Sequence, residues 1–158
     1  MTQVVGIDLG TTYSTISYIN EAGLPQIIPN AEGKKITPSV VYMQDQEVII
    51  GEEALNYVVL EHSSTVQFVK NQMGKQDYKV PLDNKEYTPA QISSFILKKL
   101  KKDAEDYLGT KIKEAIITVL DILNRKAFIK TYIKGYTRLF FHLIRESCRL
   151  ISTPSQKN

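Results

Sequence analysis

The first part of the chain alternates short apolar runs with polar turns. Val4–Leu9 is a mostly apolar run that ends at Gly10, which is typical of a buried strand leading into a tight turn. Ser14–Ile19 is rich in β-branched residues and tyrosine, and Gln26–Ile28 follows a turn signal and a proline. We therefore predict a meander of three antiparallel strands with the Gly10 turn at one end.

Polar and turn residues divide the next part of the chain into shorter pieces. Asn30–Pro38 is polar and contains a glycine and a proline, which indicates a loop. Ser39–Met43 and Glu47–Ile50 are short strand candidates, and Glu52–Leu60 is a predicted helix. For residues 61–87 we expect helical turns mixed with loop.

The clearest helix signal lies at Pro89–Tyr107. Thr88 can cap this helix, a proline suits its first position, and Gln91 completes a capping box. Gly109 ends the helix, and Ala115–Val119 is typical of a buried strand. Apolar residues spaced three and four apart mark the buried face of the helix Pro89–Tyr107: Ile92, Phe95, Ile96, Leu100, Ala104 and Tyr107. The whole pattern predicts an α/β fold, with a mixed sheet and packed helices.

Composition narrows the class of protein. The chain has 158 residues, of which 42% are hydrophobic and 23% charged, as in an ordinary soluble globular domain. No apolar run reaches the roughly 18 residues that a membrane span needs. The N-terminus lacks the basic start and apolar run of a signal peptide. Cys148 is the only cysteine, so no internal disulfide can form, and we expect a reducing, cytoplasmic setting.

The net charge of +3 hides an asymmetry. Residues 1–120 hold 12 lysines and 15 acidic residues, whereas residues 121–158 hold eight basic and two acidic residues. All four arginines and the cysteine lie after position 120. So abrupt a change indicates that the two parts have different origins.

The strongest chemical signal is the segment Gly6–Ser14. Asp8, near the end of a buried strand, places a carboxylate beside the turn that follows. The turn glycine lets the backbone approach a phosphate without an intervening Cβ, and backbone N–H groups with the Thr11 and Thr12 hydroxyls can donate to it. Because Asp8 and phosphate carry like charges, a hydrated Mg²⁺ suits the space between them. The alternative is a plain hairpin turn, and the motif alone does not decide between the two.

Two other signals have ordinary explanations. His62 and His142 lie far apart without ligand spacing, so we expect no metal site around them. The lysines at 98–102 are balanced by the acidic residues that follow, which is typical of a solvated helix face. We therefore expect no nucleic-acid partner.

Several blocks of residues 3–119 resemble the seventy-kilodalton heat-shock chaperone family, in family order and at family-like spacing. Val5–Ser14 resembles the phosphate-binding opening of the family's nucleotide-binding domain. The wider actin and sugar-kinase superfamily shares this turn, but would not share the later blocks. Those blocks are Asn30–Gly33, Thr37–Val41, Gly51–Ala54, Lys98–Gly109 and Glu114–Val119.

The resemblance implies a fold, a ligand and site residues. It implies part of an actin-like ATPase (ribonuclease H-like) lobe that binds ATP or ADP with Mg²⁺. It places Asp8 at the Mg²⁺ shell, through water, and Lys70 where the family keeps a catalytic lysine that contacts the γ-phosphate and the attacking water. Taken alone, Lys70 would be interpreted as a solvated surface lysine. The first phosphate loop would consist of Gly10, Thr11, Thr12 and Tyr13.

The resemblance stops at Val119. There the family continues with a proline that helps relay the nucleotide state to the substrate domain, and this chain lacks it. Two origins remain open for residues 120–158: a frameshift or alternative exon near codon 120, or a selected tail that is helical or disordered. Apolar residues recur at helical spacing from Ile129 to Ile151, as in a basic amphipathic helix that docks on a protein partner or an acidic membrane. Gly135 weakens such a helix by about 1 kcal/mol.

We therefore predict two parts: residues 1–119, a truncated N-terminal lobe of a chaperone nucleotide-binding domain, and residues 120–158, a basic tail. The family's second phosphate loop, adenosine pocket, opposing carboxylates and peptide-binding domain have no recognisable counterpart in the sequence. We expect an ATP-binding segment that cannot complete the ATPase or chaperone cycle, with nucleotide and co-chaperones as partners. The alternatives are a non-enzymatic interaction protein that uses the tail, and a translated remnant without function.

Overall fold

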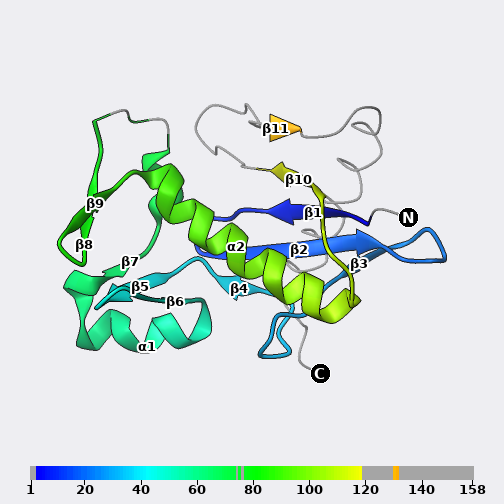
Figure 1. Ribbon diagram of the computed structural model, residues 1–158, viewed down its shortest axis with the longest axis horizontal. Helices are drawn as coiled ribbons and strands as arrows, with labels where there is room; N and C mark the ends of the chain where they lie inside the picture. Colours follow the sequence, from blue (N-terminus) through cyan, green and yellow to red (C-terminus); the bar gives the residue numbers. More distant parts are fainter. Residues whose placement is uncertain (1–2, 74, 76, 119–129, 132–158) are drawn as a thin grey trace, which may run out of the picture.

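The main sheet of the structure is mixed (Figure 1). The computed structural model describes residues 3–73, 75, 77–118 and 130–131. The strands of this sheet are β1 (Val4–Asp8), β2 (Tyr13–Ile19), β3 (Pro25–Ile27), β4 (Thr37–Pro38), β10 (Glu114–Thr118) and β11 (Lys130–Thr131). β1 pairs antiparallel with β2 and parallel with β10, and β2 pairs antiparallel with β3 and β4. The predicted meander and mixed sheet are confirmed.

The register of β1 fixes which residues meet at the end of the sheet. Ile7 lies opposite Ile16 of β2 and Ile117 of β10. One residue further on, Asp8 lies opposite Thr118 of β10. Because parallel strands run in the same direction, their carboxyl ends meet at one edge of the sheet. The Asp8 carboxylate and the turn after β1 therefore lie beside the end of β10.

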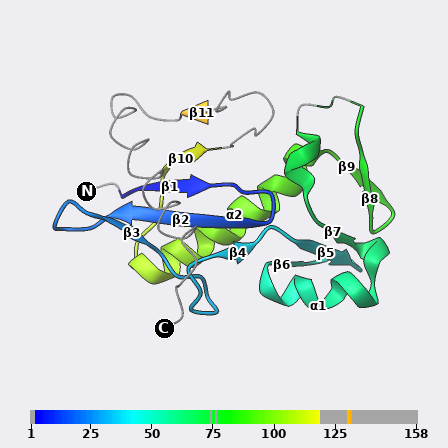
Figure 2. The same ribbon diagram turned by 180° about the vertical axis from the view of Figure 1, so that it is seen from behind.

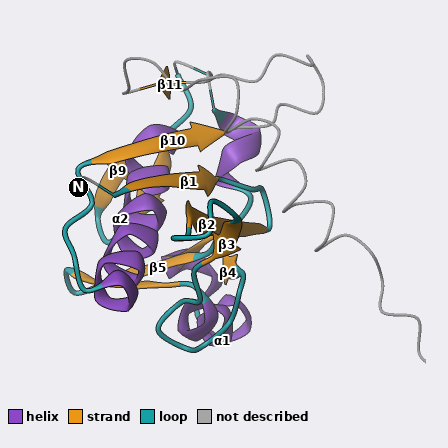
Figure 3. Cartoon of the chain, turned by 90° about the vertical axis from the view of Figure 1, so that its right-hand side faces the viewer, coloured by secondary structure: helices purple, strands orange, loops and turns teal. Residues whose placement is uncertain are grey.

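Helix α2 (Pro89–Leu108) covers one face of this sheet, as Figure 3 shows with β10, β1 and β2 side by side against it. The predicted capping box is present. Thr88 Oγ1 accepts from the N–H of Gln91 at 3.2 Å, and Gln91 Oε1 accepts from the N–H of Thr88 at 2.8 Å. Gly109 ends the helix with a φ of 64°, in the left-handed region that glycine adopts without steric cost.

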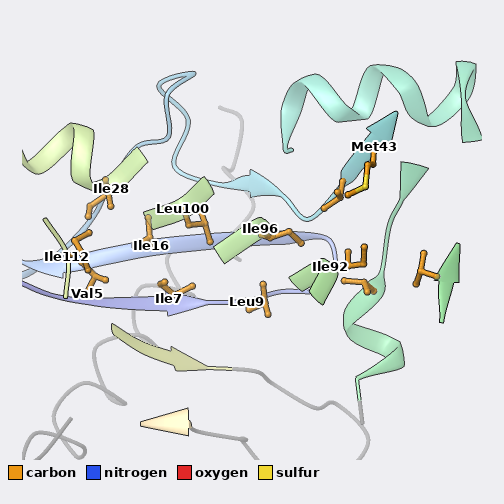
Figure 4. Packing of buried hydrophobic residues seen from close by; sticks show 14 of the residues in the cluster. Val5, Ile7, Leu9, Ile16, Ile28, Met43, Ile92, Ile96, Leu100 and Ile112 are labelled. Carbon is orange, nitrogen blue, oxygen red and sulfur yellow. The ribbon is translucent and has the colours of Figure 1, made fainter. Parts of the chain in front are cut away.

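The buried face of α2 and the main sheet share one core (Figure 4). Of the six residues predicted for this face, Phe95 is partly buried and Tyr107 is 46% exposed. The Tyr107 hydroxyl accepts from the side chain of Gln26 at 3.4 Å, so this residue lies at the rim over β3 rather than in the core. The other four residues of this face are buried in one cluster with Val5, Ile7 and Ile16: Ile92, Ile96, Leu100 and Ala104. Each fully buried isoleucine, leucine or valine side chain contributes roughly 1.5–3 kcal/mol to the stability of the fold.

A second, smaller sheet and a separate hairpin complete the described part (Figure 2). β5 pairs antiparallel with both β6 and β7, and α1 lies against this sheet. The elements are β5 (Val41–Gln44), β6 (Glu47–Ile50), α1 (Glu52–Leu60), η1 (His62–Ser64), β7 (Thr65–Val66), η2 (Val69–Gln72), β8 (Val80–Leu82) and β9 (Lys85–Tyr87), where η denotes a 3₁₀ helix.

Three local predictions differ from the structure. The segment Asn30–Pro38, expected as a loop, ends in the short strand β4, which pairs with β2. The strand expected at Ser39–Met43 is β5 and begins at Val41, because the backbone N–H of Ser39 instead donates to the carbonyl of Thr12 at 2.8 Å. The hairpin of β8 and β9 lies within residues 61–87, where we expected helical turns and loop. Its strands have three residues each and expose Lys85 and Glu86, so they carry almost no apolar alternation.

One carboxylate joins the smaller sheet to this hairpin. Asp83, in the β8–β9 turn, accepts from the backbone N–H groups of Asp45 at 3.2 Å and Gln46 at 2.9 Å, in the β5–β6 turn. Each turn has two consecutive residues with positive φ, 51° and 67° in one and 47° and 59° in the other. Such values are typical of two-residue type I′ hairpin turns. Asp83 therefore links the tips of two tight hairpins.

Lys99 differs from the other lysines at 98–102. The others are exposed, as predicted, but the Lys99 side chain is only 16% exposed. Its Nζ lies 2.8 Å from Asp103 and 3.3 Å from Glu32. Burial lowers the pKa of Lys99, but the hydrogen bonds to Asp103 and Glu32 outweigh burial and leave the pKa raised. This cation ties α2 to the loop that carries Glu32.

Of residues 120–158, the structure describes only Lys130 and Thr131, which form β11 and pair antiparallel with Ile117 and Ile116 of β10. These two residues are extended. The other predictions for the tail, including the amphipathic helix, lie outside the described residues. Within the described ranges, no helix has the length and apolar character needed to cross a membrane.

Glu105 of α2 holds the loop that leads into β10. Its carboxylate accepts from the backbone N–H of Ile112 at 2.9 Å and lies 3.1 Å from both Lys101 and Lys111. The Ile112 hydrogen bond, followed by the two lysines, lowers the pKa of Glu105 from its ordinary value of 4.5 to about 2. Because the folded-state pKa is lowered, this stabilisation is complete above about pH 4.5 and is lost as the pH falls toward 2.

We predict that Glu105→Gln lowers the melting temperature at pH 7 and makes the loss of stability between pH 4.5 and 2 shallower than in the wild type. Thermal unfolding followed by circular dichroism across this range measures both effects. Asp106→Asn changes an exposed acidic residue of the same helix and serves as the matched control. Equal acid slopes for the wild type and Glu105→Gln would contradict the assignment.

Candidate functional site

The chain folds back on itself between β1 and β2, and Gly10 makes this possible. A Cβ atom at position 10 would lie 1.9 Å from the carbonyl oxygen of Tyr13. This is far inside the contact distance of carbon and oxygen, so no side chain fits at this position. The N–H of Leu9 donates to the carbonyl of Thr118 at 3.0 Å and holds the start of the turn against β10.

Two buried serines contact the backbone of this turn. The N–H of Gly10 donates to Ser14 Oγ at 3.2 Å, and Ser39 Oγ donates to the Gly10 carbonyl at 2.9 Å. The two serine hydroxyl oxygens are 2.9 Å apart. Neither serine was predicted as a site residue. The signal was present, because Ser14 closes the Gly6–Ser14 segment and Ser39 follows the Thr-Pro pair of the next block.

Asp8 is half-buried at the carboxyl end of β1. The hydroxyl of Thr118 lies 3.3 Å from Asp8 Oδ1 and 3.4 Å from the carbonyl of Ile7, so it can donate to either. Thr118 was not predicted as a site residue, because only the parallel pairing of β1 with β10 brings it to Asp8. The sheet therefore supplies one carboxylate, with a hydroxyl partner, at the edge beside the turn.

The donor set at this edge suits magnesium bound through water. Mg²⁺ retains several waters and usually takes one or two protein carboxylates together with phosphate oxygens. Asp8 provides one such carboxylate. Among the described residues, no group of three or more histidine, cysteine, aspartate or glutamate side chains is arranged to hold a metal directly. His62 is exposed in η1, and His142 lies outside the described residues.

The 3₁₀ helix η2 brings the segment that carries Lys70 to the turn. Thr11 Oγ1 donates to Oδ1 of Asn71, the residue after Lys70, at 3.5 Å. Phe68, just before η2, has a left-handed φ of 56°, which redirects the chain into the helix. Lys70 is half-buried. The bond from Thr11 to Asn71 brings η2 to the turn, whereas the contact of Lys70 with a nucleotide stays a prediction.

A small pocket opens beside the turn. Thr12 and Tyr13 are exposed, and Thr11 is half-buried. The residues Tyr13 and Phe68 are 49% and 48% exposed. The three residues after Gly10 therefore present groups that a ligand can reach. The pocket is lined by Thr11, Thr12, Tyr13, Pro38, Ser39, Val40, Leu55, Gln67 and Phe68.

We predict that Gly10→Ala destabilises the chain by about 3 kcal/mol or more, because the turn must open to admit the new Cβ. Gly23→Ala is the matched control. Gly23 has a φ of 76° and no atom near its would-be Cβ, so it should lose only the roughly 1–2 kcal/mol of a left-handed alanine. Urea unfolding measures both. Equal losses in the two variants would show that the turn tolerates a side chain.

Comparison with known proteins identifies relatives of this chain. The family model described as Hsp70 protein matches residues 4–124, a range that extends a little beyond Val119. Chaperone protein DnaK of Thermotoga neapolitana is 55% identical over 116 residues, which are 73% of this chain and 19% of that protein. DnaK of Thermotoga petrophila and of Thermosipho africanus are 53% and 50% identical over the same shares. The chain thus spans about a fifth of the length of the curated relatives it matches.

The family match and the structure agree on the fold. The matched range contains the antiparallel meander, the Gly10 turn, the capped helix α2 and the parallel strand β10. The resemblance to the actin-like ATPase fold, seen in the sequence, is confirmed by this match. The chain belongs to the Hsp70 chaperone family and corresponds to an N-terminal segment of its nucleotide-binding domain.

Proposed function

We propose that residues 1–119 bind the phosphates of ATP or ADP at the turn formed by Gly10, Thr11, Thr12 and Tyr13. The observation that carries this proposal is the fold-back at Gly10, where a Cβ would meet the Tyr13 carbonyl at 1.9 Å. Without that atom the turn can close tightly and bring the backbone N–H groups of the next three residues together, where they can donate to an anion. Hsp70 chaperones bind nucleotide, and the matched relatives are chaperones by name, which favours a nucleotide over other anions.

The donors around this turn suit a phosphate group. Thr11 is half-buried and Thr12 is exposed, so solvent or a ligand can reach both residues. The bond from Thr11 Oγ1 to Asn71 is 3.5 Å long and therefore weak. The Thr11 hydroxyl can exchange this partner for a phosphate oxygen at little cost.

Asp8 would hold Mg²⁺ through water, and the ion would offset the charge of the phosphate oxygens. Lys70, carried by η2 next to the turn, would add a second positive charge near the γ-phosphate and the attacking water. An ammonium group at this place stabilises negative charge that develops on phosphoryl oxygens. These roles for Asp8 and Lys70 follow from the family resemblance, and the contact between η2 and the turn supports them.

We propose further that these 158 residues by themselves do not complete ATP hydrolysis or a chaperone cycle. Phosphoryl transfer needs water, metal and γ-phosphate held together by groups that converge from several sides. The residues named here approach from one side, and the chain spans about a fifth of its relatives' length. Phosphates bound at the turn would stay open to water, whose high dielectric constant weakens each charge contact.

We retain the division into residues 1–119 and residues 120–158 as part of the proposal. The change of composition near position 120 and the end of the family match at residue 124 support it. In the alternative function, the basic tail engages a co-chaperone, another protein partner or an acidic membrane. Sequencing the gene across codons 115–125 separates a selected tail from a frameshift, because a shift leaves a family-like sequence in another frame.

We predict that the chain binds ADP more tightly with Mg²⁺ than without it, and that Asp8→Ala removes most of this difference. Isothermal titration with and without Mg²⁺ measures the effect, with Asp106→Asn as the control for loss of one exposed acidic charge. An unchanged Mg²⁺ dependence in Asp8→Ala would remove Asp8 from the site. Absence of any nucleotide binding by the wild type would contradict the proposed function as a whole.

We predict that the isolated chain releases phosphate from ATP no faster than buffer does, because the candidate residues in the described part of the chain approach the phosphates from one side. A steady-state phosphate-release assay tests this beside two variants. Lys70→Ala removes the predicted catalytic ammonium, and Lys98→Ala removes an exposed lysine of α2 as the matched control. Turnover above background that is lost in Lys70→Ala alone would show that the segment is a working ATPase.

A further inference from the structure

The two buried serines and Gly10 form a closed ring of hydrogen bonds. The ring runs from the Gly10 N–H to Ser14 Oγ at 3.2 Å, across 2.9 Å to Ser39 Oγ, and back to the Gly10 carbonyl at 2.9 Å. Ser14 is 0% and Ser39 is 3% exposed, so water does not compete for these hydroxyls. The ring begins and ends on the two polar backbone groups of a single residue.

Hydrogen counting fixes the direction of this ring. A serine hydroxyl carries one hydrogen and can accept two hydrogen bonds. The Ser39 hydrogen is used on the Gly10 carbonyl, so Ser39 can only accept from Ser14. Ser14 accepts from the Gly10 N–H and therefore has its own hydrogen available for Ser39. A single arrangement of protons satisfies every group in the ring.

Ser39 also binds the turn at a second point. Its backbone N–H donates to the carbonyl of Thr12 at 2.8 Å, while its hydroxyl donates to the carbonyl of Gly10. In a planar trans peptide, the N–H points away from the carbonyl of the preceding residue. The N–H of Thr11 therefore points away from the Ser39 hydroxyl, and the N–H of Tyr13 points away from the Ser39 backbone. Two N–H groups of the turn are thus directed away from one anchoring residue.

The ring also removes one donor from the turn. The N–H of Gly10 is occupied by Ser14, so it is not available to a ligand. The backbone donors that remain belong to Thr11, Thr12 and Tyr13, and the last two residues are exposed. Gly10 therefore serves the turn by its missing Cβ and its bonds to the serines.

We propose that Ser14 and Ser39 are positioning residues of the phosphate turn: their hydrogen-bonded ring fixes the Gly10 backbone and directs the N–H groups of Thr11 and Tyr13 toward a phosphate. The phosphate ligand rests on the proposed function, whereas the ring consists of contacts within the chain itself. A turn held by such a ring needs little further ordering to bind an anion.

Ser17 offers a matched control on the same strand. Ser17 is 9% exposed, and its Oγ donates to the carbonyl of Gly6 in β1 at 3.4 Å. It resembles Ser14 in residue type, strand and depth, but its hydroxyl binds the sheet rather than the turn. Ser17→Ala therefore reports the general cost of removing a buried hydroxyl from β2.

The first arm of the test measures amide hydrogen exchange by NMR in the full chain without nucleotide. We expect the Gly10 amide to be protected in the wild type and in Ser17→Ala. In Ser14→Ala, which removes its acceptor, it should exchange at least about tenfold faster relative to the amides in the middle of β1. A fast Gly10 amide in the wild type overturns the ring, and this result does not depend on how well any variant folds.

The second arm measures affinity for MgADP by isothermal titration. We expect Ser14→Ala and Ser39→Ala to bind about tenfold more weakly than the wild type, and Ser17→Ala to bind equally well. If the wild type binds and both ring variants bind as tightly, the positioning role is overturned and the proposed function stands. If the wild type binds no MgADP, the proposed function and the link to phosphate both fail, and the exchange arm alone decides whether the ring exists.

Discussion

The pairing of β1 on both edges is the constraint on which the rest of the described structure depends. β2 binds one edge antiparallel and β10 binds the other edge in parallel, so β1 cannot shift its register without breaking both ladders. The core side chains Val5 and Ile7 face helix α2 only in this register. The same register places Asp8 beside Thr118 and starts the turn at Gly10. A fold constraint and a chemical site thus share one five-residue strand.

Local signals in the sequence were sufficient for the elements with strong periodicity or clear caps. Helix α2 was predictable at both ends, because Thr88 and Gln91 form a capping box and Gly109 takes the left-handed conformation. Elements that depend on distant contacts were not predictable in the same way. Where β4 of the main sheet gives way to β5 of the smaller sheet, the N–H of Ser39 donates to the carbonyl of Thr12, and periodicity carries no information about such a contact.

The candidate site shows the same division. The Gly10 turn and Asp8 could be predicted as candidate site residues because their residue types follow one another along the chain. Ser39 reaches the turn from 29 residues away and Thr118 reaches Asp8 from 110 residues away, through hydrogen bonds that only the folded chain defines. For Tyr107 and Lys99, helical spacing predicted the approximate face of the helix but not the exposure of the side chain. Tyr107 lies at the rim over β3 and is exposed, whereas Lys99 is largely covered and pairs with Glu32.

The Asp83 carboxylate between the two hairpin tips has a consequence for how the chain opens. The strands β8 and β9 have three residues each and could not persist as an isolated hairpin in water. By binding two consecutive amides of the β5–β6 turn, Asp83 ties that hairpin to a larger sheet. Local unfolding of the β8–β9 turn leaves the amides of Asp45 and Gln46 without Asp83, and unfolding of the β5–β6 turn leaves the Asp83 carboxylate without these amides. The two hairpins should therefore behave as one cooperative unit in native-state fluctuations. A single side chain thereby sets the size of the smallest piece of this region that can open.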